Sequence, residues 1–260
     1  MDFVAVGHLT HDRQPDGSLR PGGAAYYASV TARHLGAEAV VVSSVGPDCI
    51  ARNEFESLGI SLYEDPATET TTFENRYRQE KREQHLLALA NPINQPIPAA
   101  DVLFFGPVMQ EVPVEFIERL PPHRIAVAGL QGWMRRVNAE GLVYPVDLPD
   151  AAAFAGLDAV FASEADFRAD PLGETLALSS VVPIVALTQG SLGSLVFING
   201  KSHSICPYPA IEQDPTGAGD VYAACFACAL ANGCTALDAA DQASRLAARS
   251  VEQPGAAALL

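Results

Sequence analysis

The segment 214–220 (Asp-Pro-Thr-Gly-Ala-Gly-Asp) places glycines, a hydroxyl and two carboxylates directly before a long apolar run. Gly217 and Gly219 allow a sharp turn and a close approach of the backbone to a ligand. If the apolar run is a helix, its first N–H groups lack partners and suit an anion such as a transferring phosphoryl group. The carboxylate of Asp220 would lie in the first turn, where it can accept a proton from an attacking hydroxyl. The segment predicts phosphoryl transfer, with Asp220 as base and the backbone of Gly217, Ala218 and Gly219 as anion site.

A plainer interpretation of this segment is that one of its carboxylates only caps the helix. Asp is common at helix starts because its oxygen accepts a hydrogen bond from the first turn. A helix that begins after a glycine-rich turn needs no catalytic role to explain an Asp there. The rest of the chain must therefore decide between the two interpretations.

Buried strands that could carry such a site are predicted by short apolar runs rich in valine, isoleucine and phenylalanine. They are residues 3–7, 39–44, 102–105, 125–128, 159–161, 184–188 and 195–198. Helical patterns follow the first two strands and also fill most of the last 45 residues, at residues 24–35, 50–58, 221–231 and 236–251. This alternation predicts an α/β fold with a doubly wound, mainly parallel sheet flanked by helices.

Residues 60–93 interrupt the alternation of strand and helix. The stretch 70–73 (Thr-Thr-Thr-Phe) alternates polar and apolar character, and the apolar residues nearby are too sparse for a core element. We expect an exposed β-lid formed by segments at about 8–22 and 60–93 of one domain spanning residues 1–260. An uncovered lid edge is a liability, so pairing of two lids in a homodimer is compatible with this arrangement.

Four segments, in order along nearly the whole chain, resemble the pfkB family of carbohydrate kinases. The segment 214–220 resembles the C-terminal signature of that family, in which Gly-Ala-Gly-Asp opens the catalytic helix. Residues 21–25 (Pro-Gly-Gly-Ala-Ala) and 40–48 resemble its N-terminal signature. Residues 188–193 (Thr-Gln-Gly-Ser-Leu-Gly) are similar to its strand-end turn that contacts nucleotide phosphates. The resemblance implies a ribokinase-like fold and favours the catalytic interpretation of Asp220.

The same resemblance implies ATP-dependent phosphorylation of a hydroxyl group on a small sugar or polyol, with Mg²⁺ and, in some relatives, a monovalent cation. It assigns nucleotide binding to Thr188, Gly190, Gly193, Asp214 and Thr216. It assigns substrate binding to Asp12, Gly22 and Gly23, where the paired glycines also serve the lid hinge. The alternative for Asp12 is a solvated loop residue near a proline and a glycine.

The chain departs from the family pattern midway, where an Asn-x-x-Glu motif usually organises water around magnesium. The matching stretch is 163–166 (Ser-Glu-Ala-Asp), so a serine stands in place of the asparagine. Glu164 and Asp166 retain carboxylates that could bind the metal through water. We expect activity to persist, because a hydroxyl can also hold a metal-bound water. Ser163 is nevertheless the best argument for a catalytically weak or inactive sugar- or nucleotide-binding sensor.

Two features of the sequence concern the acceptor substrate, the stretch 70–75 and Arg135. The stretch 70–75 resembles the lid of relatives of plant inositol kinases, which implies that Asn75 bonds a hydroxyl of an inositol-like polyol. Any half-exposed β-ribbon would equally need Thr, Phe and Asn residues of this kind. Arg135 follows a predicted strand at the edge of the cleft and could face an anionic group on either ligand. Its alternative is a surface arginine, since Arg136 is adjacent and both cannot face the cleft. A nucleoside kinase or vitamin-precursor kinase of the same fold remains an open alternative.

Composition excludes other classes of protein. The formal net charge of −15 argues against nucleic acid or an anionic membrane as the main partner. Long uninterrupted apolar runs and a secretion signal are lacking in the sequence, so a cytoplasmic location is expected. Five scattered cysteines do not indicate a disulfide framework, and the pair Cys225 and Cys228 is expected to be buried in the helix after Asp220.

Overall fold

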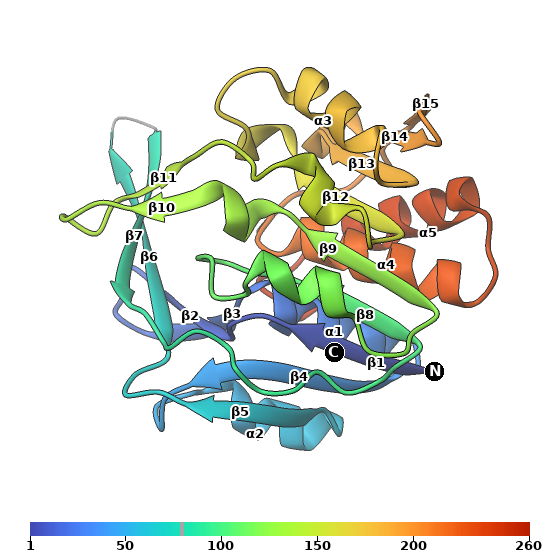
Figure 1. Cartoon of the computed structure of the whole chain (residues 1–260). Coiled ribbons are helices and arrows are strands. Elements are labelled where there is room, and N and C mark those ends of the chain that lie inside the picture. Colours follow the sequence, from blue (N-terminus) through green and yellow to red (C-terminus); the bar gives the residue numbers. More distant parts are fainter. Residues whose placement is uncertain (79–80) are drawn as a thin grey trace.

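The large sheet organises the computed structural model, which describes residues 1–78 and 81–260. Among these residues nine strands form the order β15-β14-β13-β12-β9-β8-β1-β4-β5 (Figure 1). Their bounds are β1 Asp2–Val6, β4 Glu38–Val45, β5 Ser61–Pro66, β8 Val102–Phe105, β9 Ile125–Gly129, β12 Ala159–Ser163, β13 Ile184–Thr188, β14 Ser194–Ile198 and β15 Lys201–Ile205. β14 pairs antiparallel with both β13 and β15, and the other pairs are parallel.

The central strands are buried on both faces. β8 (Val-Leu-Phe-Phe) is buried along its whole length, and β1 and β12 are almost as apolar. Continuous burial of this kind is typical of parallel sheets covered on both sides. The predicted doubly wound, mainly parallel fold is therefore confirmed, with the predicted strands at their expected positions.

Two apolar layers cover the sheet. One contains residues of α1 Ala24–His34, α2 Ala51–Leu58, α4 Ala218–Ala231 and α5 Ala236–Ser250. The other contains residues of α3 Pro171–Ser179 and three short 3₁₀ segments, η1 Val114–Arg119, η2 Gln131–Met134 and η3 Ala151–Phe154. α4 is buried nearly all round, and both Cys225 and Cys228 lie within it as predicted. The Thr235 side chain caps α5 by accepting from the Asp238 N–H.

A second sheet lies at one end of the large one, at the left of Figure 1. Its order is β3-β2-β6-β7, with β2 Thr10–Arg13, β3 Leu19–Gly22, β6 Thr71–Arg78 and β7 Lys81–Ala88. The hairpin of β10 Arg135–Val137 and β11 Val143–Pro145 lies beside it through a bridge from Leu142 to His85. The segment 60–93 is thus divided. Its first part forms β5, because a short crossover through α2 lets it pair parallel with β4 at the sheet edge.

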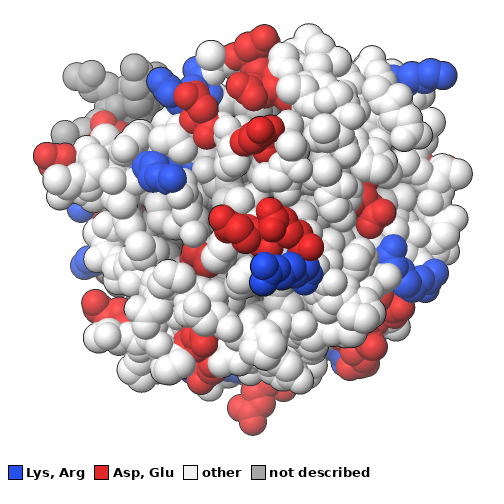
Figure 2. Space-filling model, viewed as in Figure 1, with Lys and Arg blue, Asp and Glu red and all other residues white. Residues whose placement is uncertain are grey.

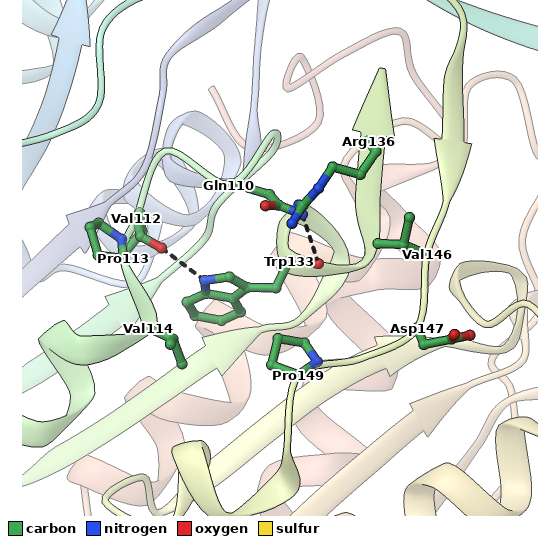
Figure 3. Close-up of a pocket in the computed structure, with 9 residues that line it drawn as sticks. All are labelled: Gln110, Val112, Pro113, Val114, Trp133, Arg136, Val146, Asp147 and Pro149. Atoms are coloured by element: carbon green, nitrogen blue, oxygen red, sulfur yellow. Dashed lines mark hydrogen bonds between the residues drawn. The ribbon is translucent and has the colours of Figure 1, made fainter. Parts of the chain in front are cut away.

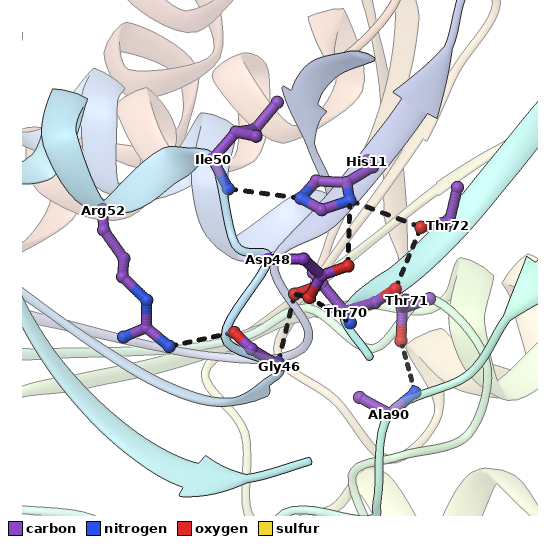
Figure 4. Close-up of polar contacts among 9 residues, drawn as sticks. All are labelled: His11, Gly46, Asp48, Ile50, Arg52, Thr70, Thr71, Thr72 and Ala90. Carbon is purple, nitrogen blue, oxygen red and sulfur yellow. Dashed lines mark hydrogen bonds and ion pairs between the residues drawn. The ribbon is translucent and has the colours of Figure 1, made fainter. Parts of the chain in front are cut away.

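Polar contacts join the small sheet to the large one (Figure 4). Asp48, in the loop after β4, accepts hydrogen bonds from the Thr70 N–H (2.9 Å) and hydroxyl (2.8 Å) at the base of β6. The buried His11 of β2 accepts from the Ile50 N–H through Nε2 (3.3 Å). Its Nδ1 faces Asp48 (4.0 Å) and Thr72 (3.4 Å). Burial lowers the pKa of His11, although Asp48 opposes this, so the neutral imidazole is favoured.

The surface is acidic overall. On the face drawn in Figure 2 basic side chains lie among carboxylates and do not form a continuous patch over the described residues. No helix among the described residues is long and apolar enough to cross a membrane. The part of the chain that the structure describes contains no group of three metal-ligating side chains.

Candidate active site

The start of α4 has the geometry that the glycine-rich segment predicts. Gly217 is the N-cap with φ of 80°, a left-handed conformation that favours glycine. A Cβ at this position would lie 2.4 Å from the ring of Tyr27, so a side chain also has no room. The Ala218 N–H donates to the Pro215 carbonyl (3.2 Å). The next N–H groups, of Gly219 and Asp220, lie in the first turn, where helices lack internal partners and anions are stabilised.

Asp220 is a half-buried carboxylate in the first turn of α4. Burial and, to a smaller extent, the nearby Asp166 carboxylate raise the pKa of Asp220 to about 7, while Arg135 opposes both. A general base is most effective when its pKa is close to the working pH. A pKa raised in this way distinguishes Asp220 from an exposed carboxylate that only caps a helix.

The second carboxylate, Asp166, is held in place from two sides. Its Oδ2 accepts from the Ser163 N–H (2.9 Å), and its Oδ1 accepts from Gln131 Nε2 (2.7 Å). The Ser163 hydroxyl in turn accepts from the Ala165 N–H (3.3 Å), which completes a capping box on the segment 164–166. Ser163 thus has a structural reason to be a serine. Gln131 had no predicted role, and only the structure reveals its contact with Asp166.

Glu164 is exposed and contacts the turn after β13. Its carboxylate accepts from Gln189 Nε2 (2.7 Å), in the turn after β13. Together Glu164 and Asp166 offer oxygen ligands whose lone pairs are partly occupied by protein donors. Such a pair fits a hydrated magnesium ion, which usually keeps several waters and binds proteins through one or two carboxylates.

The turn after β13 is built for close backbone approach. Gly190 and Gly193 both have positive φ, at 57° and 94°, and a Cβ on Gly193 would lie 2.1 Å from the Ile205 carbonyl oxygen. The Gln189 N–H donates to the Gly193 carbonyl and closes the turn (2.9 Å). Thr188 anchors its start by donating to the Ala162 carbonyl of β12 (3.3 Å).

Asp214 organises the loop before α4. Burial alone would raise its pKa, but hydrogen bonds from Thr216 and Gly255 and the charge of Arg20 hold the pKa of Asp214 below its usual value. Its oxygens accept from the Thr216 N–H (3.0 Å) and the Gly255 N–H (3.1 Å). Arg20 of β3 lies 3.6 Å away and joins the small sheet to this loop. No motif in the sequence indicated the contact with Arg20.

The predicted substrate carboxylate, Asp12, lies beside the paired glycines. A Cβ on Gly22 would lie 2.5 Å from Asp12 Oδ2, and one on Gly23 would lie 2.5 Å from the His8 carbonyl oxygen. Tyr27, one helical turn beyond, has its pKa raised by burial and then by the carboxylates of Asp12, Asp214 and Asp220. These three predicted residues therefore surround one buried tyrosine that the sequence did not single out.

Asn75 and Arg135 are joined through a third residue. Gln84 of β7 donates to Asn75 Oδ1 of β6 (3.4 Å) and accepts from Arg135 Nη1 (3.2 Å). Arg135 also lowers the pKa of Asp220. A row of polar side chains thus runs from the small sheet to Asp220. Gln84 lacked any sequence signal because its position depends on the pairing of β6 with β7.

Three comparisons with known proteins bear on the family and the fold of the chain. A family model described as pfkB family carbohydrate kinase matches residues 1–260. The chain is 39% identical over 71 residues to an inositol 3-kinase of Zea mays, a match that spans 27% of this chain and 19% of the maize protein.

Two solved structures share the fold. One is a pyrophosphate-dependent kinase in the ribokinase family complexed with a pyrophosphate analog and myo-inositol (TM-score 0.83, 21% identity, 97% of this chain and 96% of that one). The other is a fructokinase double mutant of Vibrio cholerae with fructose, ADP and potassium (TM-score 0.73, 18% identity, 100% of this chain and 95% of that one).

Proposed function

The chain belongs to the pfkB family of carbohydrate kinases, and from this premise we propose that it transfers the terminal phosphoryl group of ATP to a hydroxyl group of a small polyol. An inositol-like polyol is the acceptor class that we favour. The partial match to inositol 3-kinase and the polar row of Asn75, Gln84 and Arg135 support this choice. The observation that carries the proposal is Asp220, a carboxylate with a pKa raised to about 7 at the start of α4.

In this mechanism the acceptor hydroxyl lies between Asp12 and Asp220. Asp220 takes the hydroxyl proton as the acceptor oxygen bonds to phosphorus and the bond from phosphorus to the bridging oxygen of ADP breaks. The N–H groups at the start of α4 and the guanidinium of Arg135 stabilise the charge on the transferring oxygens. The turn at Thr188, Gly190 and Gly193, together with Asp214 and Thr216, holds the donor phosphates.

Magnesium, when bound, neutralises charge on the donor phosphates, and Glu164 and Asp166 would hold its water molecules. A monovalent cation is a further requirement that we propose to test, since the fructokinase of this fold was solved with potassium. The small sheet of β2, β3, β6 and β7 acts as a lid over the acceptor in this proposal. Its edge strands offer a surface through which two copies could pair.

The test is product formation by the purified protein with magnesium and a panel of inositols, sugars, other polyols and nucleosides. The donors are ATP and pyrophosphate, because one relative of this fold is pyrophosphate-dependent. Asp220→Asn should lower kcat by about 100- to 10,000-fold while ligand binding is retained. Asp238→Asn is the matched control, since Asp238 occupies the first turn of α5 as Asp220 does in α4. Equal turnover in Asp220→Asn and wild type would remove Asp220 from the base role.

A second candidate function is a binding protein that keeps the fold without turnover, and Ser163 is the residue that favours it. Calorimetry with ATP and the same acceptor panel separates the two. Binding without product from any donor and acceptor pair would support the binding protein. A Ser163→Asn variant that gains turnover would identify this position as the cause.

A further inference from the structure

A cavity of about 360 Å³ lies outside the proposed active site, between the loop after β8 and the loop after β11 (Figure 3). Its wall is mixed: the Trp133 indole lies between Val112, Pro113 and Val114 on one side and Val146 and Pro149 on the other, and the polar lining residues are Gln110, Arg136 and Asp147. Trp133 is only 5% exposed and is fixed by its Nε1, which donates to the Val112 carbonyl (2.8 Å). The volume is at the lower end of the range for small-molecule sites.

The cavity carries a positive charge at its rim. Its charged residues are Arg136 and Asp147. Asp147 is paired with Arg168 (3.0 Å). Among the described residues Arg136 forms no ion pair with a carboxylate, and its Nη1 donates a hydrogen bond to the Arg135 carbonyl (3.3 Å). A guanidinium close to an indole and other apolar side chains suits a small molecule with a carboxylate and an apolar body.

One short segment, residues 131–136, links this cavity to the proposed active site. Gln131 binds Asp166, Arg135 acts on Asp220, and Trp133 and Arg136 line the cavity. The backbone of this segment packs closely against the loop after β8, because a Cβ on its Gly132 would lie 2.1 Å from the backbone of Pro107.

A cavity residue also holds the backbone of this segment. Gln110 donates through Nε2 to the carbonyls of Arg135 (2.8 Å) and Trp133 (3.2 Å). Gln110 itself has φ of 63°, a left-handed conformation that is uncommon for a residue other than glycine. A ligand that contacts Gln110, Trp133 or Arg136 would therefore act on the backbone that carries Arg135.

We propose that this cavity is an effector site for a small carboxylate with an apolar body, and that its occupancy changes the position of Arg135 and so the affinity for the acceptor. The coupling to the acceptor rests on the proposed kinase function. The binding itself does not, and it can be measured without turnover.

Trp133 provides a direct readout of binding, because it is the single tryptophan of the chain. The probe is benzoate, with benzyl alcohol as the uncharged control. We expect benzoate to change the Trp133 emission saturably with a Kd of about 1 mM, and benzyl alcohol to bind at least about tenfold more weakly. Arg136→Gln should weaken benzoate binding by about tenfold, and Asp147→Asn should strengthen it by about threefold because it removes a like charge. Arg124→Gln, at the opposite end of β9, is the matched surface control and should not alter binding.

Equal benzoate binding by wild type and Arg136→Gln would overturn the site, as would an emission that does not change up to about 10 mM benzoate. In the kinase assay, saturating benzoate should change the acceptor KM by about fivefold in wild type and not in Arg136→Gln. Unchanged kinetics at saturating benzoate would overturn the coupling. A protein that binds benzoate as described and phosphorylates no acceptor would refute the kinase proposal and leave the site in place.

Discussion

At the scale of single residues, the proposed chemistry depends on how two neighbours, Asp166 and Arg135, set the protonation of Asp220. Burial and Asp166 raise the pKa of Asp220 to about 7, and Arg135 lowers it. Asp220 can act as a base only when it is deprotonated. Turnover should therefore rise with pH through about 7 and level off above it.

Replacing Asp166 and replacing Arg135 should move the rising part of this pH profile, its acidic limb, in opposite directions. Asp166→Asn removes a negative charge, so the limb should shift to lower pH, and Arg135→Gln removes a positive charge, so it should shift to higher pH. The measurement is kcat/KM for the acceptor from pH 5 to 9 for both variants and wild type. Both variants should also lose rate, which makes the position of the limb the informative quantity. Limbs that coincide in all three proteins would show that another group titrates.

At the scale of elements, the two glycines that open α4 have different tasks. Gly217 has φ of 80° and no room beside Tyr27, whereas a Cβ on Gly219 would meet nothing within 4 Å. Gly217 is therefore needed to form the turn, and Gly219 leaves open space where a phosphoryl group would approach.

Alanine substitutions should separate these tasks. Gly217→Ala should lower the free energy of unfolding by about 2–4 kcal/mol, because it combines left-handed strain with a clash. Gly219→Ala should leave stability unchanged or raise it by up to about 1 kcal/mol, since alanine favours helix, while kcat falls because the methyl group occupies the anion site. Chemical denaturation and the kinase assay measure the two effects. A Gly217→Ala protein as stable as wild type would contradict this division.

The elements also show which parts of the fold and of the candidate site could be predicted from the sequence. Apolar runs predicted the strands and the start of α4 because burial and capping are local properties of the chain. The sequence pattern predicts one lid over residues 60–93, but β5 joins the large sheet. The pattern could not show this, because the choice of partner strand depends on the crossover through α2. Contacts such as Arg20 with Asp214 and Gln131 with Asp166 join distant segments. Only the folded chain brings them together, so no spacing in the sequence could reveal them.

At the scale of the whole molecule, His11 makes the attachment of the small sheet sensitive to acid. Its Nε2 accepts from the Ile50 N–H. In a protonated imidazole this nitrogen carries a hydrogen, so two N–H donors would face each other and the hydrogen bond would be lost. The pKa of His11 is lowered from its usual value of 6.5, chiefly by burial. Stability contributed by the neutral form is present above pH 6.5 and is lost as the pH falls below it.

His11→Gln should reduce this acid sensitivity. We expect wild type to lose unfolding free energy between pH 7 and pH 5 through this residue, and the variant to lose less. His123→Gln is the control, because His123 is exposed and contacts only its own loop. Urea denaturation at both pH values gives the comparison. Equal losses in wild type and His11→Gln would assign the acid sensitivity elsewhere.

The small sheet has a further consequence for how the chain reaches its native state. Its two central strands, β2 and β6, pair in parallel from Thr10 and Thr71 onward, with β4, α2 and β5 between them in the chain. This pairing has a high contact order, since a long loop must close before it forms, and such contacts are slow to assemble. The small sheet should therefore be among the last parts to fold, after the amino-terminal strands of the large sheet. For the same reason it is not a contiguous unit that could be exchanged between relatives by a single recombination event.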